Sequence, residues 1–140
     1  MTFVMSSKRP DPPVLTRAES QVLQAVWDLG AGTVQQILER LGKDLAYTTV
    51  LTLVRILEQK GYVDHVPHPG GGRAHLFRPK VEPARARRMH ARDLVDRLFG
   101  GRPQTLVAGL LEDEAFSRED LEALRQQIDS RLGDGKGRKR

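Results

Sequence analysis

Apolar and polar positions in the first half of the chain recur with a period that predicts three short helices. The apolar residues return every three or four positions between Thr16 and Gly30, between Thr33 and Gly42, and from Ala46 to Lys60. This is the spacing of a helix that buries one face. The expected core positions are Val22, Leu23, Val26, Trp27, Val34, Ile37, Leu38, Leu41, Val50, Leu53, Val54 and Leu57.

The ends of these three segments carry residues that start and stop helices. Thr16 with Glu19, and Thr33 with Gln36, have the spacing of a capping box, in which two side chains bind each other's backbone amides in the first turn. Each segment is also followed by a glycine, the residue that commonly closes a helix. These glycines are Gly30, Gly42 and Gly61.

A different pattern follows the third segment and predicts a β-hairpin. Residues 62–66 and 74–78 are short strand-like runs, and two prolines and three consecutive glycines lie between them. Three helices followed by a hairpin give the element order of a winged helix-turn-helix domain, which we assign to residues 15–80.

The remaining residues return to helical periodicity and predict three further helices. They are separated by the glycines and proline of 100–103 and by Ser117, which begins a Ser-x-x-Asp cap. Few other helices are left to cover their apolar stripes, so we expect residues 81–133 to form a helical dimerisation domain. The residues expected in the dimer contact are Leu94, Leu98, Phe99, Leu106, Leu110, Leu121, Leu124 and Ile128.

Composition agrees with a mainly α fold that carries one small β-hairpin. Aromatic residues make up 5% of the 140 residues, and a chain rich in Leu, Val and Ala favours helices packed on helices. Residues 1–14, with Lys8 and Arg9, are expected to form a flexible basic arm, and residues 134–140 a disordered basic tail. No stretch approaches the roughly 20 apolar residues of a membrane helix, so we expect a cytoplasmic protein without direct membrane insertion.

Charge and missing residue types narrow the function. The formal net charge is +5, which favours a polyanionic partner such as nucleic acid. The absence of cysteine excludes disulfides, thiolate metal sites and cysteine catalysis. The chain also has no Gly-rich phosphate loop, nucleophile motif or pair of catalytic acids. We therefore expect no enzymatic activity and no cofactor.

The outward face of the third helix carries residue types that bind DNA. Thr48, Thr52 and Arg55 share this face, where arginine can pair with guanine and threonine can bind a phosphate or touch a thymine methyl. Arg73 follows the hairpin glycines, which allow a close approach to a phosphate. A solvated helix face and a mobile loop with an incidental arginine are the alternatives. The predicted DNA-binding residues are Tyr47, Thr48, Thr49, Thr52, Arg55, Arg73 and His75.

Three histidines of the hairpin raise the alternative of a metal-sensing regulator. His65, His68 and His75 are close in sequence, but no carboxylate or thiol at ligand spacing completes a tetrahedral set. We therefore predict no metal site. The alternatives to a DNA-binding repressor are a metal-sensing winged-helix regulator and a protein-interaction module whose basic charge is incidental.

The stretches 15–27, 33–38 and 45–57 resemble the penicillinase-repressor family of BlaI, MecI and CopY type. The resemblance runs from about Leu15 to Leu132, and it is most specific at Thr48-Thr-Val-x-Thr-Leu53. It implies a bacterial transcriptional repressor that joins a winged-helix domain to a helical dimerisation domain. Such a homodimer would bind a two-fold symmetric, double-stranded operator of a β-lactam-resistance, copper-homeostasis or related stress operon.

The resemblance also implies a route of induction. In the family, a membrane sensor-protease triggers cleavage of an Asn-Phe bond in the dimerisation domain. That position corresponds to Gly109-Leu110 here, which is the candidate cleavage site and departs from the family pattern. The copper-responsive branch releases DNA through a C-terminal cysteine motif, and this chain contains no cysteine.

Overall fold

A computed structural model of the chain describes residues 12–42 and 44–138. Lys8 and Arg9 of the predicted arm lie outside the described residues, as do residues 139 and 140 of the predicted tail. The chain divides into two compact units, each of which has its own elements.

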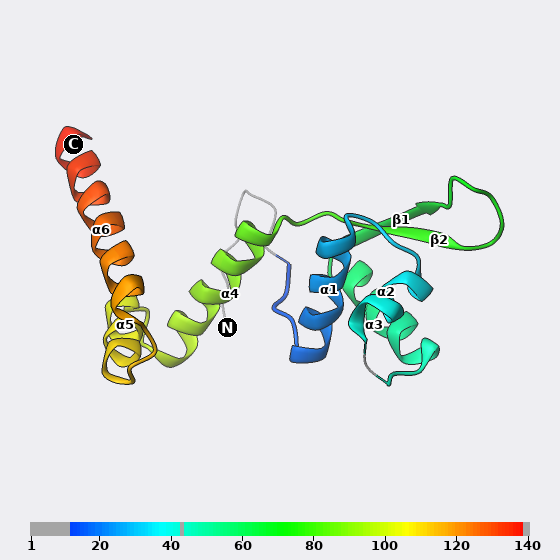
Figure 1. The fold of residues 1–140 in the computed structure, drawn as a ribbon, viewed down its shortest axis with the longest axis horizontal. Coiled ribbons are helices and arrows are strands. Elements are labelled where there is room, and N and C mark those ends of the chain that lie inside the picture. The colour runs from blue at the N-terminus through cyan, green and yellow to red at the C-terminus, as the bar shows by residue number, and fades with distance from the viewer. Residues whose placement is uncertain (1–11, 43, 139–140) are drawn as a thin grey trace, which may run out of the picture. The chain divides into compact units, whose positions relative to one another are not determined.

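The first unit ends at Asp93 and has the predicted element order, three helices followed by a hairpin (Figure 1). Each of the three helices ends within one residue of its prediction, and both strands begin one residue later than predicted. The elements are α1 (Arg17–Leu29), α2 (Val34–Leu41), α3 (Tyr47–Gln59), β1 (Val63–Pro67), β2 (His75–Pro79) and the first part of α4 (Pro83–Leu98).

Both predicted capping boxes are present. The Glu19 amide donates to Thr16 Oγ1 at 3.2 Å, and the Thr16 amide donates to the Glu19 carboxylate at 3.0 Å. The Gln36 amide donates to Thr33 Oγ1 at 3.1 Å, and the Thr33 amide donates to Gln36 Oε1 at 2.9 Å. Four residues therefore determine where α1 and α2 start, because they satisfy amides that the helices themselves leave unpaired.

The core of the first unit lies where the apolar faces of the helices meet the base of the hairpin. Every predicted core position is buried or packs against this cluster. Tyr62 and Phe77 contribute buried rings from the hairpin region, and the Trp27 indole nitrogen donates to the Val81 carbonyl at 2.9 Å. The buried helix residues include Val22, Leu23, Val26, Val34, Ile37, Val50, Val54 and Leu57.

The hairpin is a two-stranded antiparallel sheet in which His65 pairs with Phe77 and Pro67 pairs with His75. Gly32, before α2, adds a bridge to this sheet: its amide donates to the Phe77 carbonyl at 3.0 Å, and the Phe77 amide donates back at 2.8 Å. Because side chains alternate along a strand, the two histidines lie on the same face as Phe77. The buried Phe77 ring turns that face toward the helices.

The first part of α4 belongs to this unit, although the sequence predicts a domain boundary after residue 80. Val81 and Ala86 are buried in its core. His90 Nε2 accepts a hydrogen bond from the Leu15 amide at 2.9 Å. The periodicity of this segment predicts a buried face but does not show which unit covers that face. In the structure the division between the two units follows Asp93, not residue 80.

Two residues of the predicted flexible arm are held by the folded unit. The Tyr62 hydroxyl donates to the Pro13 carbonyl at 2.7 Å, and Lys60 Nζ donates to the Val14 carbonyl at 3.1 Å. These contacts connect the end of the predicted arm to the first unit. A proline-rich segment forms no regular ladder, but its carbonyls still accept hydrogen bonds from side chains.

The second unit contains the last part of α4 together with α5 (Pro103–Glu112) and α6 (Arg118–Arg138). The predicted cap of the last helix is present: the Asp120 amide donates to Ser117 Oγ at 3.0 Å, and the Ser117 amide donates to Asp120 Oδ2 at 3.1 Å. The three helices predicted for this part of the sequence are therefore confirmed.

The last helix is longer than predicted, because α6 continues through Arg138 where the sequence predicts disorder from residue 134. Each glycine weakens a helix by only about 1 kcal/mol, and no proline removes a backbone donor in this segment. The helical hydrogen bonds therefore continue into the predicted tail. No helix in the described part of the chain is both long and apolar enough to cross a membrane.

Candidate nucleic-acid interface

One side of α3 faces away from the core and carries the predicted DNA-reading residues. Tyr47, Thr48, Thr49, Thr52 and Arg55 are all exposed. The opposite side of the helix lies in the core, so α3 cannot rotate without exposing apolar side chains to water. This packing holds the polar face of α3 in a fixed orientation.

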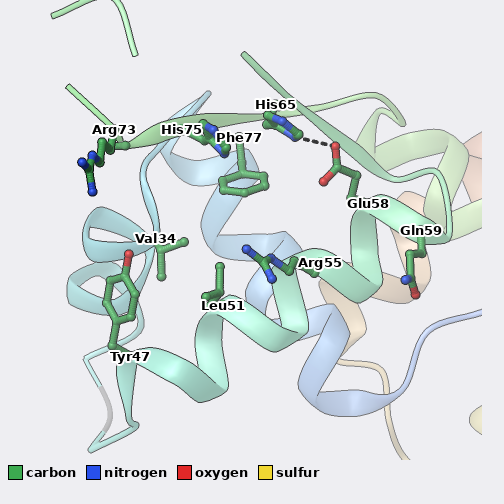
Figure 2. Close-up of a pocket in the computed structure, with 11 residues that line it drawn as sticks. Val34, Tyr47, Leu51, Arg55, Glu58, Gln59, His65, Arg73, His75 and Phe77 are labelled. Atoms are coloured by element: carbon green, nitrogen blue, oxygen red, sulfur yellow. Dashed lines mark hydrogen bonds and ion pairs between the residues drawn. The ribbon is translucent and has the colours of Figure 1, made fainter. Parts of the chain in front are cut away.

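A groove of about 500 Å³ lies between α3 and the hairpin (Figure 2). It brings together four of the predicted DNA-binding residues: Tyr47 and Arg55 from α3, and Arg73 and His75 from the hairpin. Thr48, Thr49 and Thr52 are not part of its lining, although they are exposed on the same helix. The predicted residues thus divide between the groove and the outer face of α3.

Arg55 and Arg73 supply the groove with positive charge. Figure 2 shows the Arg55 guanidinium in the middle of the groove below Phe77, and Arg73 at one end of the lining, beyond His75. Within the described residues, neither arginine has an ion-pair or hydrogen-bond partner. Two unpaired guanidinium groups beside an exposed helix are suited to binding an anion such as a DNA phosphate.

Glu58 and His65 also line the groove, although neither is among the binding residues predicted from the sequence. His65 Nδ1 lies 2.6 Å from Glu58 Oε2. The His65 and His75 rings stack with centroids 4.4 Å apart and planes 18° apart. The alternation of β1 and β2 would have placed both histidines on one face, but their approach to Glu58 depends on how the hairpin packs against α3.

Arg78 lies on the opposite face of the hairpin and is already paired. Its Nε and Nη2 donate to the two Asp64 carboxylate oxygens at 3.1 Å and 3.0 Å. This hydrogen-bonded pairing with Arg78 lowers the pKa of Asp64 and raises the pKa of Arg78. Arg78 therefore links the two strands of the hairpin and is not an unpaired cation like Arg55 and Arg73.

The hairpin histidines do not converge on a common point where a metal could bind. His68 Nδ1 accepts a hydrogen bond from the Gly70 amide at 2.9 Å inside the turn, while His65 contacts Glu58. Among the described residues, no three His, Asp or Glu side chains are grouped to hold a metal ion. The metal-sensing alternative therefore lacks a ligand set in this part of the chain.

An ion pair between Glu19 of α1 and Lys60, directly after α3, holds these two helices together. Lys60 Nζ donates to Glu19 Oε1 at 2.6 Å, and the Glu19 side chain is only 7% exposed. Burial raises the pKa of Glu19, but the hydrogen bonds from Lys60 and Thr16 and the Lys60 charge together lower it, and the net effect is a lowered pKa. Glu19 thus caps α1 and holds α3 in place at the same time.

The second unit exposes a set of apolar side chains. Leu98 is 67% exposed, Ile128 is 57% exposed and Leu132 is 66% exposed. Of the residues predicted for the dimer contact, Leu98, Leu110, Leu121 and Ile128 are exposed, and Leu94, Phe99, Leu106 and Leu124 are partly buried. Gly109 and Leu110, the candidate cleavage site, are both exposed within α5.

Several known proteins are similar to this chain in sequence over most of its length. The profile of a family described as penicillinase repressor matches residues 15–130. The penicillinase repressor of Bacillus licheniformis is 22% identical over 119 residues, which are 84% of this chain and 91% of that protein. The methicillin resistance regulatory protein MecI of Staphylococcus aureus strain N315 is also 22% identical over 119 residues, 84% of this chain and 94% of its own.

Solved structures are similar in fold. A mutant of MarR from E. coli superposes with a TM-score of 0.51 at 19% identity, over 84% of this chain and 78% of that one. The mainly α fold with a small β-hairpin, predicted from the sequence, is confirmed by this likeness and by the elements themselves.

Proposed function

Because the chain belongs to the penicillinase repressor family, whose members are DNA-binding transcriptional repressors and not enzymes, we propose that it binds a two-fold symmetric operator as a homodimer. Each protomer would place one winged-helix unit on one half-site. Repression would follow because the bound dimer occludes the promoter.

The observation that carries this proposal is the groove between α3 and the hairpin. Arg55 lines this groove from α3, whose exposed face also carries the threonines, and Arg73 lines it from the hairpin. In our proposal, α3 enters the major groove, where Thr48, Thr49 and Thr52 contact bases or phosphates and Arg55 pairs with guanine. Arg73, His75 and Tyr47 then hold the backbone of the same half-site.

The exposed apolar side chains of the second unit support the dimer. Burying one leucine or isoleucine side chain contributes about 1.5–3 kcal/mol, and Leu98, Leu110, Leu121 and Ile128 are all available in a single copy. We propose that a second copy of the chain covers them. Two linked half-sites also raise the effective concentration of the second winged-helix unit once the first is bound.

The names of the relatives suggest the regulated genes. A penicillinase repressor and a methicillin resistance regulatory protein both align over most of this chain, and we propose that the operator belongs to a β-lactam-resistance or related stress operon. Release by a membrane sensor-protease or another inducing protease would require cleavage near Gly109 and Leu110. That enzyme would have to accept a Gly-Leu bond on an exposed helix.

The experiment that tests the proposal is a fluorescence-anisotropy titration of the purified chain. The chain's own upstream promoter duplex is compared with a scrambled duplex of equal length across a salt series. We expect tight binding to the promoter with two protomers per duplex, and an affinity that falls steeply with salt because bound phosphates release counterions. Equal, weak and salt-independent signals from both duplexes would instead favour a protein-interaction module.

A further inference from the structure

The stacked histidines form one wall of the α3–hairpin groove. His65 lies opposite Phe77 in the strand register, and His75 lies diagonally across from His65 on the same face. Phe77 is 4% exposed and lies 5.6 Å from the His65 ring and 6.5 Å from the His75 ring, measured between centroids. Phe77 therefore supports the stack from the core side and leaves both imidazoles accessible from the groove.

Glu58 determines which nitrogen of His65 carries the proton. An ionised carboxylate only accepts hydrogen bonds, so the 2.6 Å contact with Glu58 Oε2 requires a proton on His65 Nδ1. In a neutral ring the other nitrogen, Nε2, then has no proton. It cannot donate to a phosphate oxygen unless the ring becomes an imidazolium.

Charged and titratable groups face His65 from both sides of the groove. Glu58 and Arg55 come from α3, His75 lies on β2, and Arg73 stands at the end of the same groove. A positive charge on one ring of the stack disfavours a second charge on the other, since the centroids are only 4.4 Å apart. Asp64, the other acid of the hairpin strands, pairs with Arg78 on the opposite face.

We propose that Glu58, His65 and His75 form a proton-coupled phosphate site, in which one imidazolium donates to a backbone phosphate of the DNA strand that runs between α3 and the hairpin. The proton comes from solvent and is taken up as the phosphate binds. This inference rests on the proposed function, because it specifies how the same groove holds DNA. It makes DNA affinity rise as pH falls, since the protonated form is the one that binds.

Isothermal titration calorimetry of the full chain with its upstream promoter duplex tests this site. Titrations at one pH in buffers of different ionisation heat give the number of protons taken up. We expect the wild type to take up about one proton per protomer, with an affinity that rises by at most about tenfold per pH unit for each proton.

His65→Gln and His75→Gln are the test variants, and His68→Gln is the matched control because His68 binds Gly70 inside the turn. We expect His65→Gln to lose most of the proton uptake and about tenfold of the affinity at pH 6, with little change at pH 8. The control should behave like the wild type. Wild-type proton uptake in both test variants, with DNA still bound, would overturn the phosphate site and leave the repressor proposal intact.

Glu58→Gln gives a second, independent readout. A glutamine amide can donate to Nδ1, so the neutral ring can carry its proton on Nε2 and offer it to a phosphate. We expect tighter binding at pH 8 and a weaker pH dependence, whereas Glu39→Gln, which removes an exposed carboxylate outside the groove, should keep the wild-type pH profile.

Inorganic phosphate alone separates a DNA site from a general anion site. We expect it to cause no comparable proton uptake, because a free ion lacks the neighbouring phosphates and the contacts of α3. Equal uptake with inorganic phosphate would overturn the assignment to the DNA backbone. If the wild type binds neither the promoter nor any other duplex, the proposed function and this inference fall together.

Discussion

Individual residues determine the local geometry to different degrees. Thr16 with Glu19 could be identified from the sequence, because a capping box depends on residue types three positions apart. The ion pair from Glu19 to Lys60 could not, since it joins two helices whose approach depends on the whole core. The same reason explains why Glu58 and His65 were missed as groove residues.

The Glu19–Lys60 pair leads to a stability prediction with a defined pH dependence. Glu19→Gln should destabilise the first unit by about 1–3 kcal/mol at pH 7, because it removes the carboxylate of a charge-assisted hydrogen bond. The pKa of Glu19 is lowered in the folded state, so its stabilising effect is complete above the unfolded pKa of about 4.3. The effect is lost as pH falls through the lower folded pKa.

Urea unfolding followed by tryptophan fluorescence measures the stability of the first compact unit, because the single tryptophan, Trp27, lies in α1 of that unit. Glu39→Gln, an exposed position, is the control and should change stability by less than about 0.5 kcal/mol. A Glu19→Gln deficit that stays constant from pH 7 down to pH 2 would contradict the assignment of this ion pair.

For the helices and strands, the spacing of apolar residues predicts where each helix lies in the sequence, but it is a weaker guide to which elements pack against that helix. The pattern of α3 and its neighbours could be predicted because each helix has one strongly apolar face that meets the others. For α4 the same pattern indicated a buried face, yet Ala86 lies in the core of the first unit, which no local pattern could show. The glycines near the end of the last helix favour a helix end at about residue 133, but α6 continues to Arg138, because a glycine can still form the helical hydrogen bonds.

The exposed stripe of α6 leads to a prediction about assembly. Ile128→Asp should leave the fold of a single copy intact, since Ile128 is 57% exposed there. In the proposed dimer it would bury an unpaired charge, which costs about 3 kcal/mol or more and weakens association about a hundredfold. Sedimentation velocity across a concentration series measures the change.

Gln127→Asp is the matched control, because it adds the same charge at the exposed position immediately before Ile128. It should dimerise like the wild type. If Ile128→Asp also sediments as an intact dimer, the dimer contact does not include this face of α6.

In the whole molecule, the two compact units correspond to the two proposed roles, DNA binding and dimerisation. The first unit holds the polar face of α3 and the groove arginines on a packed core, and the second unit exposes apolar side chains. One winged-helix unit contacts too few bases to select an operator among many genomic sites. The proposed repressor therefore uses both units: the first would contact the DNA, and the second would join two copies of the chain.

If the α3–hairpin groove binds DNA as proposed, the affinity for the promoter duplex depends on Arg55, and Arg55→Ala measures that dependence. Arg40→Ala serves as the control, because Arg40 pairs with Asp28 away from the groove. We predict that Arg55→Ala loses about 1–3 kcal/mol of promoter binding, as expected when an arginine contact to a base is removed, while Arg40→Ala binds like the wild type. An unchanged promoter affinity for Arg55→Ala would show that Arg55 does not contact the DNA and that the groove is not the binding site proposed here.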